Sequence, residues 1–464
     1  MSAAHTPSWT EQLLALQGRP ITDADRQRAA LHLIDWLGCV LLGHTSPAGQ
    51  ALHRWAAQAA PGPCWAVGGL SLRSEDAALV NGSLGNIDEL DDLHREAVVH
   101  PADTLMAAAL ALAQREQATP HALLDAVVRG YEVAIRVGLL AGTAHYQHWY
   151  STATCGVFGA ATAAASLLQL DATQALHALA QAGMQASGVW QCRLEPGFSK
   201  QLATGRSAQS GVLAADLAAA GMAGPRHILE GQHGWLAATG SLPDATRARA
   251  VLAPAPGTPW LIHAVSFKPW PACRHVHPAM ACAMQLHVQI ADVGEIVRIE
   301  VSSYQTALDF ADRAQPHTTQ QARFSLQHAV AVALLRGDFG LADTLPESLA
   351  QSALVRLRAA TQVHATSRWS RAYPAHYGAQ VRVWLRDGRR LAAEVADAPG
   401  DPENPLSNAA VLAKAQRVMQ AAGHGSQPVT ALIQACADLP HAASLDGLWQ
   451  IGRASCRERV SSPV

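Results

Sequence analysis

Residues 254–257 of this sequence, Pro-Ala-Pro-Gly, separate two parts whose apolar residues follow different periods. Before them, apolar residues recur every three or four positions, as in residues 23–42, and this spacing predicts one helix after another. After them, residues 295–301 read Glu-Ile-Val-Arg-Ile-Glu-Val and residues 379–385 read Ala-Gln-Val-Arg-Val-Trp-Leu, alternations that are typical of half-buried strands. The sequence therefore predicts a mainly α fold with an α+β domain.

Further elements follow from the same patterns and from the positions of Gly, Pro and capping residues. We predict helices over residues 105–113, 123–141, 156–170, 207–221, 324–335, 346–360 and 408–422, and a returning strand over 391–395. We expect a large all-helical domain over residues 1–265, a smaller inserted α+β lid domain over 266–397, and a helical segment over 398–450 that rejoins the first domain. Residues 451–464, including Cys456, do not continue the pattern and are predicted to be a non-native tail.

The composition excludes several classes of protein. Only 15% of the 464 residues are charged and the net charge is −2, which argues against a disordered chain and against an electrostatic nucleic-acid binder. We find no apolar run of about 20 residues and no signal-peptide pattern, so we expect a cytoplasmic protein that is not bound to a membrane. The eight cysteines are dispersed without Cys-x-x-Cys pairs, which argues against a zinc, iron–sulfur or disulfide framework.

The first candidate for chemistry is the acidic stretch that runs from Asn81 to Pro101. Four carboxylates occupy residues 88–92 and repel one another, so at least one must pair with a cation, take up a proton or face solvent. Glu89 and Asp92 are three residues apart, on one face if this stretch is helical, and His94 and His100 follow within reach. A solvated, acidic helix end is the alternative interpretation.

The second candidate is residues 267–278, which hold Lys268, Arg274, His275 and His277 among three prolines, a Phe and a Trp. The chain has 31 arginines and only three lysines, so a lysine that persists is a candidate for proton chemistry, which guanidinium cannot perform. Arg274 is suited to bind a carboxylate, and a desolvated Lys268 is suited to act as an acid or base. A surface loop of basic residues is the alternative.

The third candidate is a recurring pattern at the start of Ala-rich helices. Residues 151–156, 200–207 and 100–101 each lead into such a helix, and the N–H groups at a helix N-terminus attract anions. Taken singly, each is equally typical of ordinary capping. Together with Lys268 and Arg274 they predict a site for a multiply charged carboxylic acid.

These blocks, taken in order, resemble the MmgE/PrpD family, which includes 2-methylcitrate dehydratase, cis-aconitate decarboxylase and iminodisuccinate epimerase. The resemblance rests on residues 81–101, 152–161, 205–211, 267–278, 322–326 and 400–405 and extends to about Trp449. It implies a helical domain with an α+β lid, a homodimer, and a reaction on a small polycarboxylate without a metal or organic cofactor.

The resemblance also implies a set of site residues: Glu89, Asp92, His100, Lys268, Arg274 and His275 or His277. This chain departs from the family pattern in three places. Tyr150 stands where the dehydratase and decarboxylase relatives tend to have His, and Gln209 stands where some have Lys, which leaves Lys200 as the nearest lysine. Ala102-Asp103 replaces a Gly-led run after His100-Pro101.

The roles that we predict centre on a carbanion next to a carboxylate. Lys268 and His100 are the leading acid/base candidates, and Glu89 and Asp92 would orient His100. Tyr150 would donate a proton or form a hydrogen bond with the substrate. The predicted substrate-binding residues are Arg274, His275, His277, Lys200, Arg206, Gln209 and His94. We expect the acidic residues near 90 to face Lys268 and Arg274, and we expect Lys268→Ala to abolish turnover with a nearly unchanged melt.

A hydro-lyase like 2-methylcitrate dehydratase is the leading prediction for the reaction. An epimerase or a decarboxylase acting on a related acid is the alternative, because Tyr150 and a lysine on opposite faces of a carbon would permit inversion. A protein that binds a polycarboxylate without turning it over is the third reading, although a desolvated lysine beside acids argues for use in catalysis.

Overall fold

The computed structural model describes residues 6–195 and 197–449, and these form two compact units. The helical unit contains the described residues up to Ile87, then Asp91–Val265 and the residues from Ser407 onward. The α+β unit contains Ser266–Leu406 together with Asp88–Leu90, three residues of the acidic stretch. The mainly α fold with a separate α+β part, predicted from the sequence, is confirmed. The predicted tail, residues 451–464, lies outside the described residues.

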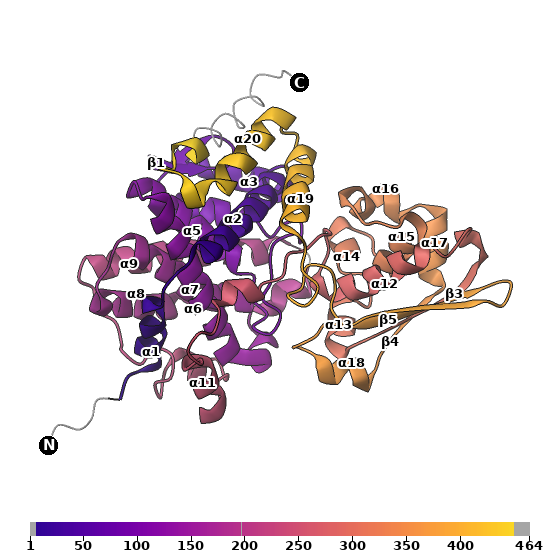
Figure 1. Cartoon of the computed structure of the whole chain (residues 1–464), viewed down its shortest axis with the longest axis horizontal. Coiled ribbons are helices and arrows are strands. Elements are labelled where there is room, and N and C mark those ends of the chain that lie inside the picture. Colours follow the sequence, from indigo (N-terminus) through magenta and orange to yellow (C-terminus); the bar gives the residue numbers. More distant parts are fainter. Residues whose placement is uncertain (1–5, 196, 450–464) are drawn as a thin grey trace. The chain divides into compact units, whose positions relative to one another are not determined.

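The helical unit is built around Ala-rich helices that pack closely (Figure 1). Small residues allow this approach: a side chain at Gly156 would lie 2.5 Å from the Thr104 hydroxyl, and one at Gly211 would lie 2.4 Å from Ala160. The elements of the unit are α1 (Trp9–Ala15), α2 (Asp23–His44), α3 (Pro47–Ala56), β1 (Pro61–Ala66), β2 (Leu70–Leu72), α4 (Ser74–Leu84), α5 (Pro101–Arg115), α6 (Pro120–Tyr146), α7 (Ser151–Leu167), α8 (Ala172–Gln185), α9 (Ser199–Ala219), α10 (Trp235–Ala238), α11 (Ala245–Leu252), α19 (Asn408–Ala421) and α20 (Ser426–Ala437).

The C-terminal helices return to the helical unit, where α19 packs against α2. A buried ion pair joins the two helices, because Lys414 Nζ lies 2.7 Å from Asp35 Oδ1. Burial raises the pKa of Asp35 to about 6, and the Lys414 charge opposes that rise. A segment more than 300 residues from α2 in the sequence therefore completes the same core, as the sequence analysis expects.

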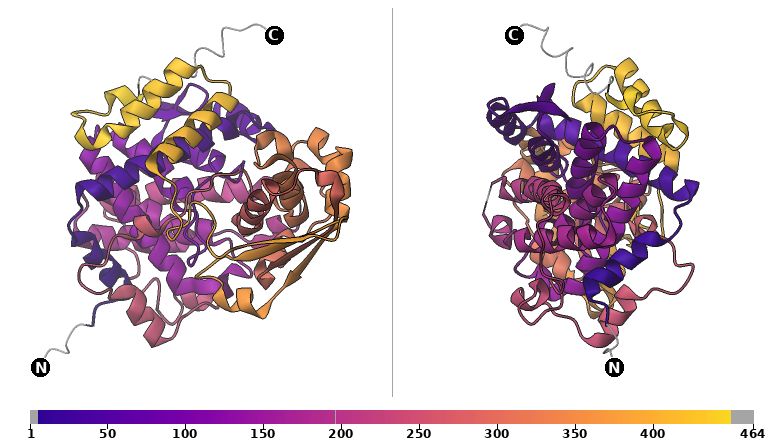
Figure 2. Two further views of the ribbon diagram at one scale, coloured as in Figure 1. Left: turned by 45° about the vertical axis from the view of Figure 1, so that its right-hand side comes forward. Right: turned by 90° about the vertical axis from the view of Figure 1, so that its left-hand side faces the viewer.

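The α+β unit contains a four-stranded sheet in the order β4-β3-β5-β6. Strand β3 pairs in parallel with β4 and antiparallel with β5, and α12 packs against β5 and β6 on one face (Figures 1 and 2). Buried and exposed residues alternate along β5, which is the reason for the period-two pattern in its sequence. The elements are α12 (His277–His287), β3 (Ile296–Ser303), α13 (Gln305–Ala311), α14 (Thr319–Arg323), α15 (Leu326–Arg336), α16 (Pro346–Leu349), α17 (Ser352–Ala359), β4 (Thr361–Ala365), α18 (Ser367–Ala372), β5 (Ala379–Leu385) and β6 (Arg390–Val395).

Several elements differ from the sequence prediction. Strand β4 was not predicted, because it is a five-residue edge strand with a weak apolar alternation. The predicted helix over 346–360 is two helices, α16 and α17, and helix α9 begins eight residues before its predicted start. The α+β unit extends to Leu406 rather than to 397, because the loop after β6 pairs with residues 266–274.

Every helix in the described part of the chain falls short of the length and apolarity that a bilayer crossing requires. The seven cysteines within the described residues form no disulfide bonds with one another, and six of them are buried. They pack as small apolar residues, in keeping with their dispersed positions in the sequence.

Candidate active site

His100 is held by a buried carboxylate in the helical unit. Its Nδ1 lies 2.7 Å from Oδ2 of Asp91, a residue that is 1% exposed, and the amide of Asn86 donates to the same carboxylate. His100 is the N-cap residue of α5, and its backbone N–H donates to the hydroxyl of Thr152 at 3.0 Å. Its side chain is 13% exposed. The histidine is therefore oriented on one side and accessible to solvent elsewhere.

Asp92 does not orient His100, contrary to the sequence prediction. Its Oδ2 lies 2.8 Å from Nδ1 of His32 and accepts a hydrogen bond of 2.6 Å from the Tyr131 hydroxyl. Its Oδ1 accepts from the backbone N–H of Ala102 in the first turn of α5. Burial lowers the pKa of His32 to about 4 and raises that of Tyr131 well above its usual value. Asp92 thus anchors the start of α5 to α2 and α6.

The acidic stretch is a series of turns rather than a helix, so Glu89 and Asp92 do not share a helical face. Glu89 has a positive φ of 54°, which reverses the chain direction between its neighbours. It belongs to the α+β unit, where its Oε2 lies 3.5 Å from Nζ of Lys268. The expected approach of an acid near 90 to Lys268 is therefore present, and Glu89 is the residue that makes it.

Lys268 is completely buried, which alters the expected result of replacing it. Lys268→Met should lower the free energy of unfolding by about 3 kcal/mol, because it removes the cation beside the buried Glu89 carboxylate. The melt is thus expected to change, unlike in the prediction from sequence. Lys268→Arg is the matched variant: it keeps the charge, so the melt should be retained while turnover falls, since guanidinium does not exchange protons near neutral pH. Wild-type turnover by Lys268→Arg would remove Lys268 from the proton transfer.

Arg274 is committed to partners inside the α+β unit. Its Nη2 lies 2.5 Å from Oδ1 of the fully buried Asp401 and donates to the Ala398 carbonyl. Its Nη1 donates to the Pro399 carbonyl and lies 2.9 Å from Nδ1 of His277. These contacts occupy both terminal nitrogens of the guanidinium. Arg274 therefore holds the loop of residues 398–401, and its terminal nitrogens are not available to a substrate carboxylate.

His275 and His277 are also enclosed. His277 accepts from Arg274 at Nδ1, so its Nε2–H donates to the Ala272 carbonyl at 3.0 Å, and the ring is neutral. His275 Nδ1 lies 2.7 Å from the Tyr304 hydroxyl, and its ring stacks on Tyr377 with centroids 5.2 Å apart. Neither histidine has the geometry of the predicted substrate-binding residue, because each is used in packing this unit.

Tyr150 and Lys200 lie together in the helical unit. Tyr150 is the N-cap residue of α7, and Nζ of Lys200, in the first turn of α9, lies 5.7 Å from the centre of its ring. Trp190 covers the same tyrosine ring, with centroids 4.7 Å apart. His100 contacts Thr152 in the first turn of α7. The N-termini of α5 and α7 are therefore adjacent, and that of α9 lies beside α7.

The remaining predicted binding residues lie apart from this group. Arg206 is exposed on α9 and bonds to Gln209, which also donates to Asp76 of α4 at 3.4 Å. His94 is buried, accepts from the backbone N–H of Ala97, and has a pKa lowered to about 3 by burial and by the charge of Arg95. It is therefore neutral at physiological pH. None of these three positions is oriented toward His100 or Tyr150 by a contact in the structure.

Sequence reasoning missed the partners that orient His100 and Asp92. Asn86 and Asp91 were inside a quoted motif without a role, and His32 and Tyr131 carried no signal because they occupy buried positions in ordinary helical patterns. Asp103, noted in the sequence as a departure from the family pattern, accepts from the Trp36 indole at 3.1 Å. The positions of Asp91 and Asp92 in the sequence do not show which of the two carboxylates lies beside His100.

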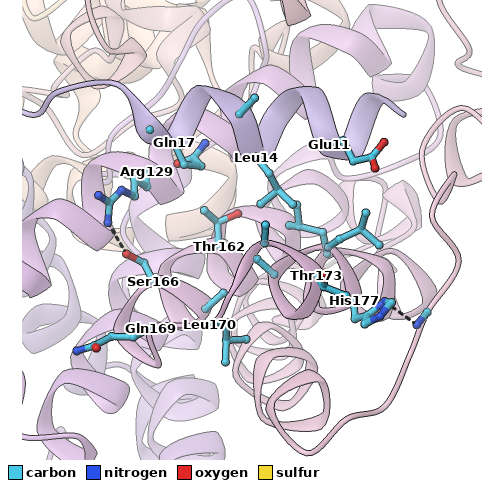
Figure 3. A pocket seen from close by; sticks show the side chains of 18 of the residues that line it. Glu11, Leu14, Gln17, Arg129, Thr162, Ser166, Gln169, Leu170, Thr173 and His177 are labelled. Atoms are coloured by element: carbon cyan, nitrogen blue, oxygen red, sulfur yellow. Dashed lines mark hydrogen bonds between the residues drawn. The ribbon is translucent and has the colours of Figure 1, made fainter. Parts of the chain in front are cut away.

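A groove of about 930 Å³ lies elsewhere on the helical unit, between α1, α6, α7 and α8 (Figure 3). Arg129 donates to Ser166 at its edge, and Glu11 pairs with Arg226. None of the predicted site residues lines it. No contact among the described residues connects this groove to His100, Tyr150 or Lys268, so we do not assign the predicted reaction to it.

Among the described residues, one group of side chains has the composition and spacing of a metal site: His376, Asp397 and Glu403 of the α+β unit. None of them was singled out in the sequence. The groups around His100 and Lys268 consist of paired acids and bases, and the structure places no such cluster of ligand atoms there.

Two family models match this chain, one in its N-terminal part and one in its C-terminal part. The model of the MmgE/PrpD N-terminal domain matches residues 11–248, and that of the MmgE/PrpD C-terminal domain matches residues 270–439. The chain is 30% identical over 227 residues to the cis-aconitate decarboxylase-like protein oryM of Aspergillus oryzae, which is 45% of each chain. It is 28% identical over 217 residues to the cis-aconitate decarboxylase of Aspergillus terreus, 45% of this chain and 44% of that one.

A longer match, 25% identical over 351 residues, is to the human cis-aconitate decarboxylase and covers 72% of this chain and 70% of the human protein. The matches to the Aspergillus proteins span a little under half of their length. The two family models together extend over both structural units, and the first alone covers half of the chain. The chain therefore belongs to the MmgE/PrpD family.

Proposed function

We propose that this chain is a lyase that moves a proton at a carbon next to a carboxylate group of a small polycarboxylate. The observation that carries the proposal is the pair formed by His100 and Asp91, 2.7 Å apart, at the adjacent N-termini of α5 and α7. A carboxylate 2.7 Å from Nδ1 favours the tautomer that carries its proton on Nδ1, and this tautomer leaves the Nε2 lone pair of His100 as a base. An oriented imidazole of this kind is the group most often used for proton transfer.

The surroundings of His100 supply charge for an anionic substrate. The N–H groups at the starts of α5 and α7 carry partial positive charge, and Lys200 adds a full positive charge beside Tyr150. Such groups stabilise the negative charge that develops on a carboxylate when a neighbouring proton is removed. Tyr150 is proposed as the acid, because its phenolic hydroxyl can donate a proton and its ring lies near both Lys200 and Trp190 at the N-terminus of α7.

Dehydration is the first candidate reaction: His100 removes the proton, and the hydroxyl on the next carbon leaves as water with a proton from the acid. The names of the relatives make decarboxylation the second candidate. In that reaction a C–C bond breaks, CO₂ leaves, and the electron pair left on carbon takes up a proton. Epimerisation would return the proton to the opposite face of the same carbon. All three reactions use the same oriented imidazole.

Lys268 and Glu89 are a second proposed acid/base pair, located in the α+β unit. Lys268 is fully buried and its Nζ lies 3.5 Å from Oε2 of Glu89, so the structure places a proton donor beside a proton acceptor. Proton transfer requires a group that can lose its proton, which arginine cannot do. This is a reason for a chain with only three lysines to keep one at this position.

The test is to incubate the protein in deuterated water with 2-methylcitrate, citrate, cis-aconitate or iminodisuccinate. Dehydration should produce double-bond absorbance, decarboxylation should release CO₂ with one deuterium in the product, and epimerisation should give deuterium exchange alone. A substrate that binds without any of these signals would support the polycarboxylate-binding alternative and contradict the proposal.

A homodimer, which the family resemblance implies, remains a prediction for this chain. Light scattering of the purified protein should give a mass near twice the 48.9 kDa of one chain. A mass of one chain at micromolar concentration would contradict the prediction.

A further inference from the structure

We propose that His376, Asp397 and Glu403 form a binding site for a divalent cation of the zinc type, and that the cation fastens the loop which holds Arg274. The three residues come from the segment before β5 and from the two ends of the loop after β6. One ligand atom from each lies within 4.8 Å of the others. The inference concerns the α+β unit alone and does not depend on the proposed reaction.

The ligand set and its spacing fit zinc. Ligands bound at 2.0–2.2 Å in tetrahedral geometry are separated by about 3.3–3.5 Å. His376 Nδ1 is already 2.9 Å from Oδ1 and 3.2 Å from Oδ2 of Asp397. Glu403 is exposed, and its ligand atom lies within 4.8 Å of the other two. His376 is 48% exposed, which leaves room for water as the fourth ligand.

The chemistry of the ligands also selects the class of cation. One imidazole nitrogen and two carboxylate oxygens suit Zn²⁺ and other late first-row divalent ions. Mg²⁺ and Ca²⁺ prefer sites made entirely of oxygen, and Mg²⁺ keeps several of its waters. We therefore expect Zn²⁺ and Co²⁺ to bind and an excess of Mg²⁺ not to displace them.

The loop between the two acidic ligands is rigid and packs against residues 266–274. The Asn404 amide donates to the Asp397 carbonyl at 3.1 Å, and Gly400 N–H donates to the Asn404 carbonyl at 2.8 Å. Gly400 has a φ of 95°, and a Cβ there would lie 1.9 Å from the Phe267 carbonyl, so only glycine fits this approach. The hydrogen bonds that hold the backbone of this loop reduce the entropy lost when the two acidic side chains bind a cation.

The same loop carries the partners of Arg274. Asp401 accepts from Arg274 and from the Ser266 hydroxyl, and the carbonyls of Ala398 and Pro399 accept from Arg274. A cation that joins both ends of this loop to His376 would hold these acceptors in place. Because the three ligands are brought together only by folding, the cation should bind the folded chain and raise its melting temperature.

The experiment is a titration of the full-length, metal-free chain with ZnCl₂ in competition with a chromophoric chelator. We expect saturable binding of one Zn²⁺ per chain, at least tenfold weaker in His376→Gln and in Glu403→Gln, with a loss of the Zn²⁺-dependent rise in melting temperature. His317→Gln, which changes an exposed histidine of the same unit, is the matched control and should bind as the wild type does.

A second measurement distinguishes cation binding at this site from cation binding by cysteine thiolates. Co²⁺ bound by one nitrogen and two oxygens should give weak visible absorption without the intense near-ultraviolet band of a thiolate ligand. Equal affinity in His376→Gln and the wild type, a thiolate band, or no saturable binding at micromolar Zn²⁺ would overturn the proposal, and His376 and Asp397 would then be an ordinary surface hydrogen bond.

Discussion

Turnover should fall by about 10²–10⁴-fold when His100 is replaced by glutamine, while the melting temperature changes little. Glutamine retains a polar group at the N-terminus of α5 and the backbone N–H that donates to Thr152, so the local fold is kept. It cannot accept and release a proton near neutral pH, so the chemical step is lost. The measurement is kcat with whichever substrate gives a signal in deuterated water, together with thermal unfolding of the same preparation.

Asp91→Asn gives an independent check on the same pair. An amide at this position can donate to Nδ1 of His100 and would then favour the wrong tautomer, so kcat should fall although the side chain is nearly isosteric. His233→Gln, at an exposed position of the helical unit, is the control and should retain activity. Wild-type turnover in both His100→Gln and Asp91→Asn would contradict the assignment of this pair to catalysis.

Arg274→Met should lower the free energy of unfolding by about 3–5 kcal/mol, because it leaves the buried carboxylate of Asp401 without its cation. The carbonyls of Ala398 and Pro399 lose donors in the same step. For a unit of this size the loss corresponds to a decrease in melting temperature on the order of 10 °C. Chemical denaturation with a probe in the α+β unit provides the measurement.

The double variant Arg274→Met, Asp401→Leu tests the cause of that loss. Removing both charges of a buried pair costs much less than removing one, so the double variant should be more stable than Arg274→Met alone. If Arg274 instead bound the substrate carboxylate, Arg274→Met would raise KM with an unchanged melt. That result would restore the role predicted from sequence and contradict the position seen in the structure.

The helices and the two alternating strands could be predicted from the sequence, because buried residues recur every three or four positions in a helix and every second position in a strand. Strand β4 was not readable, since a short edge strand buries few residues, and helix α9 began earlier than predicted because its first turn is polar. The position of Lys200 inside that first turn, rather than in the preceding loop, follows from the same shift.

The partners of the carboxylates in the acidic stretch could not be predicted from the local sequence. The spacing allowed Glu89 and Asp92 to share a helical face, but the stretch is not helical and the two residues belong to different units. Asp91 orients His100, and Asp92 holds His32 and Tyr131. A one-residue difference in a run of carboxylates decides which of them reaches a histidine, and only the folded backbone sets it.

The sequence by itself determined the family, the mainly α fold with its α+β part, and the residue types available for proton transfer, because periodicity and ordered motifs are local properties of the chain. The tertiary structure decided which partner each titratable group has. Arg274, which the motif presented as a ligand for substrate, is bound to Asp401 and to the carbonyls of Ala398 and Pro399, more than 120 residues away, and His277 is bound to Arg274. Buried polar side chains find hydrogen-bond partners in distant parts of the chain, and a local sequence pattern does not show which partner each side chain has.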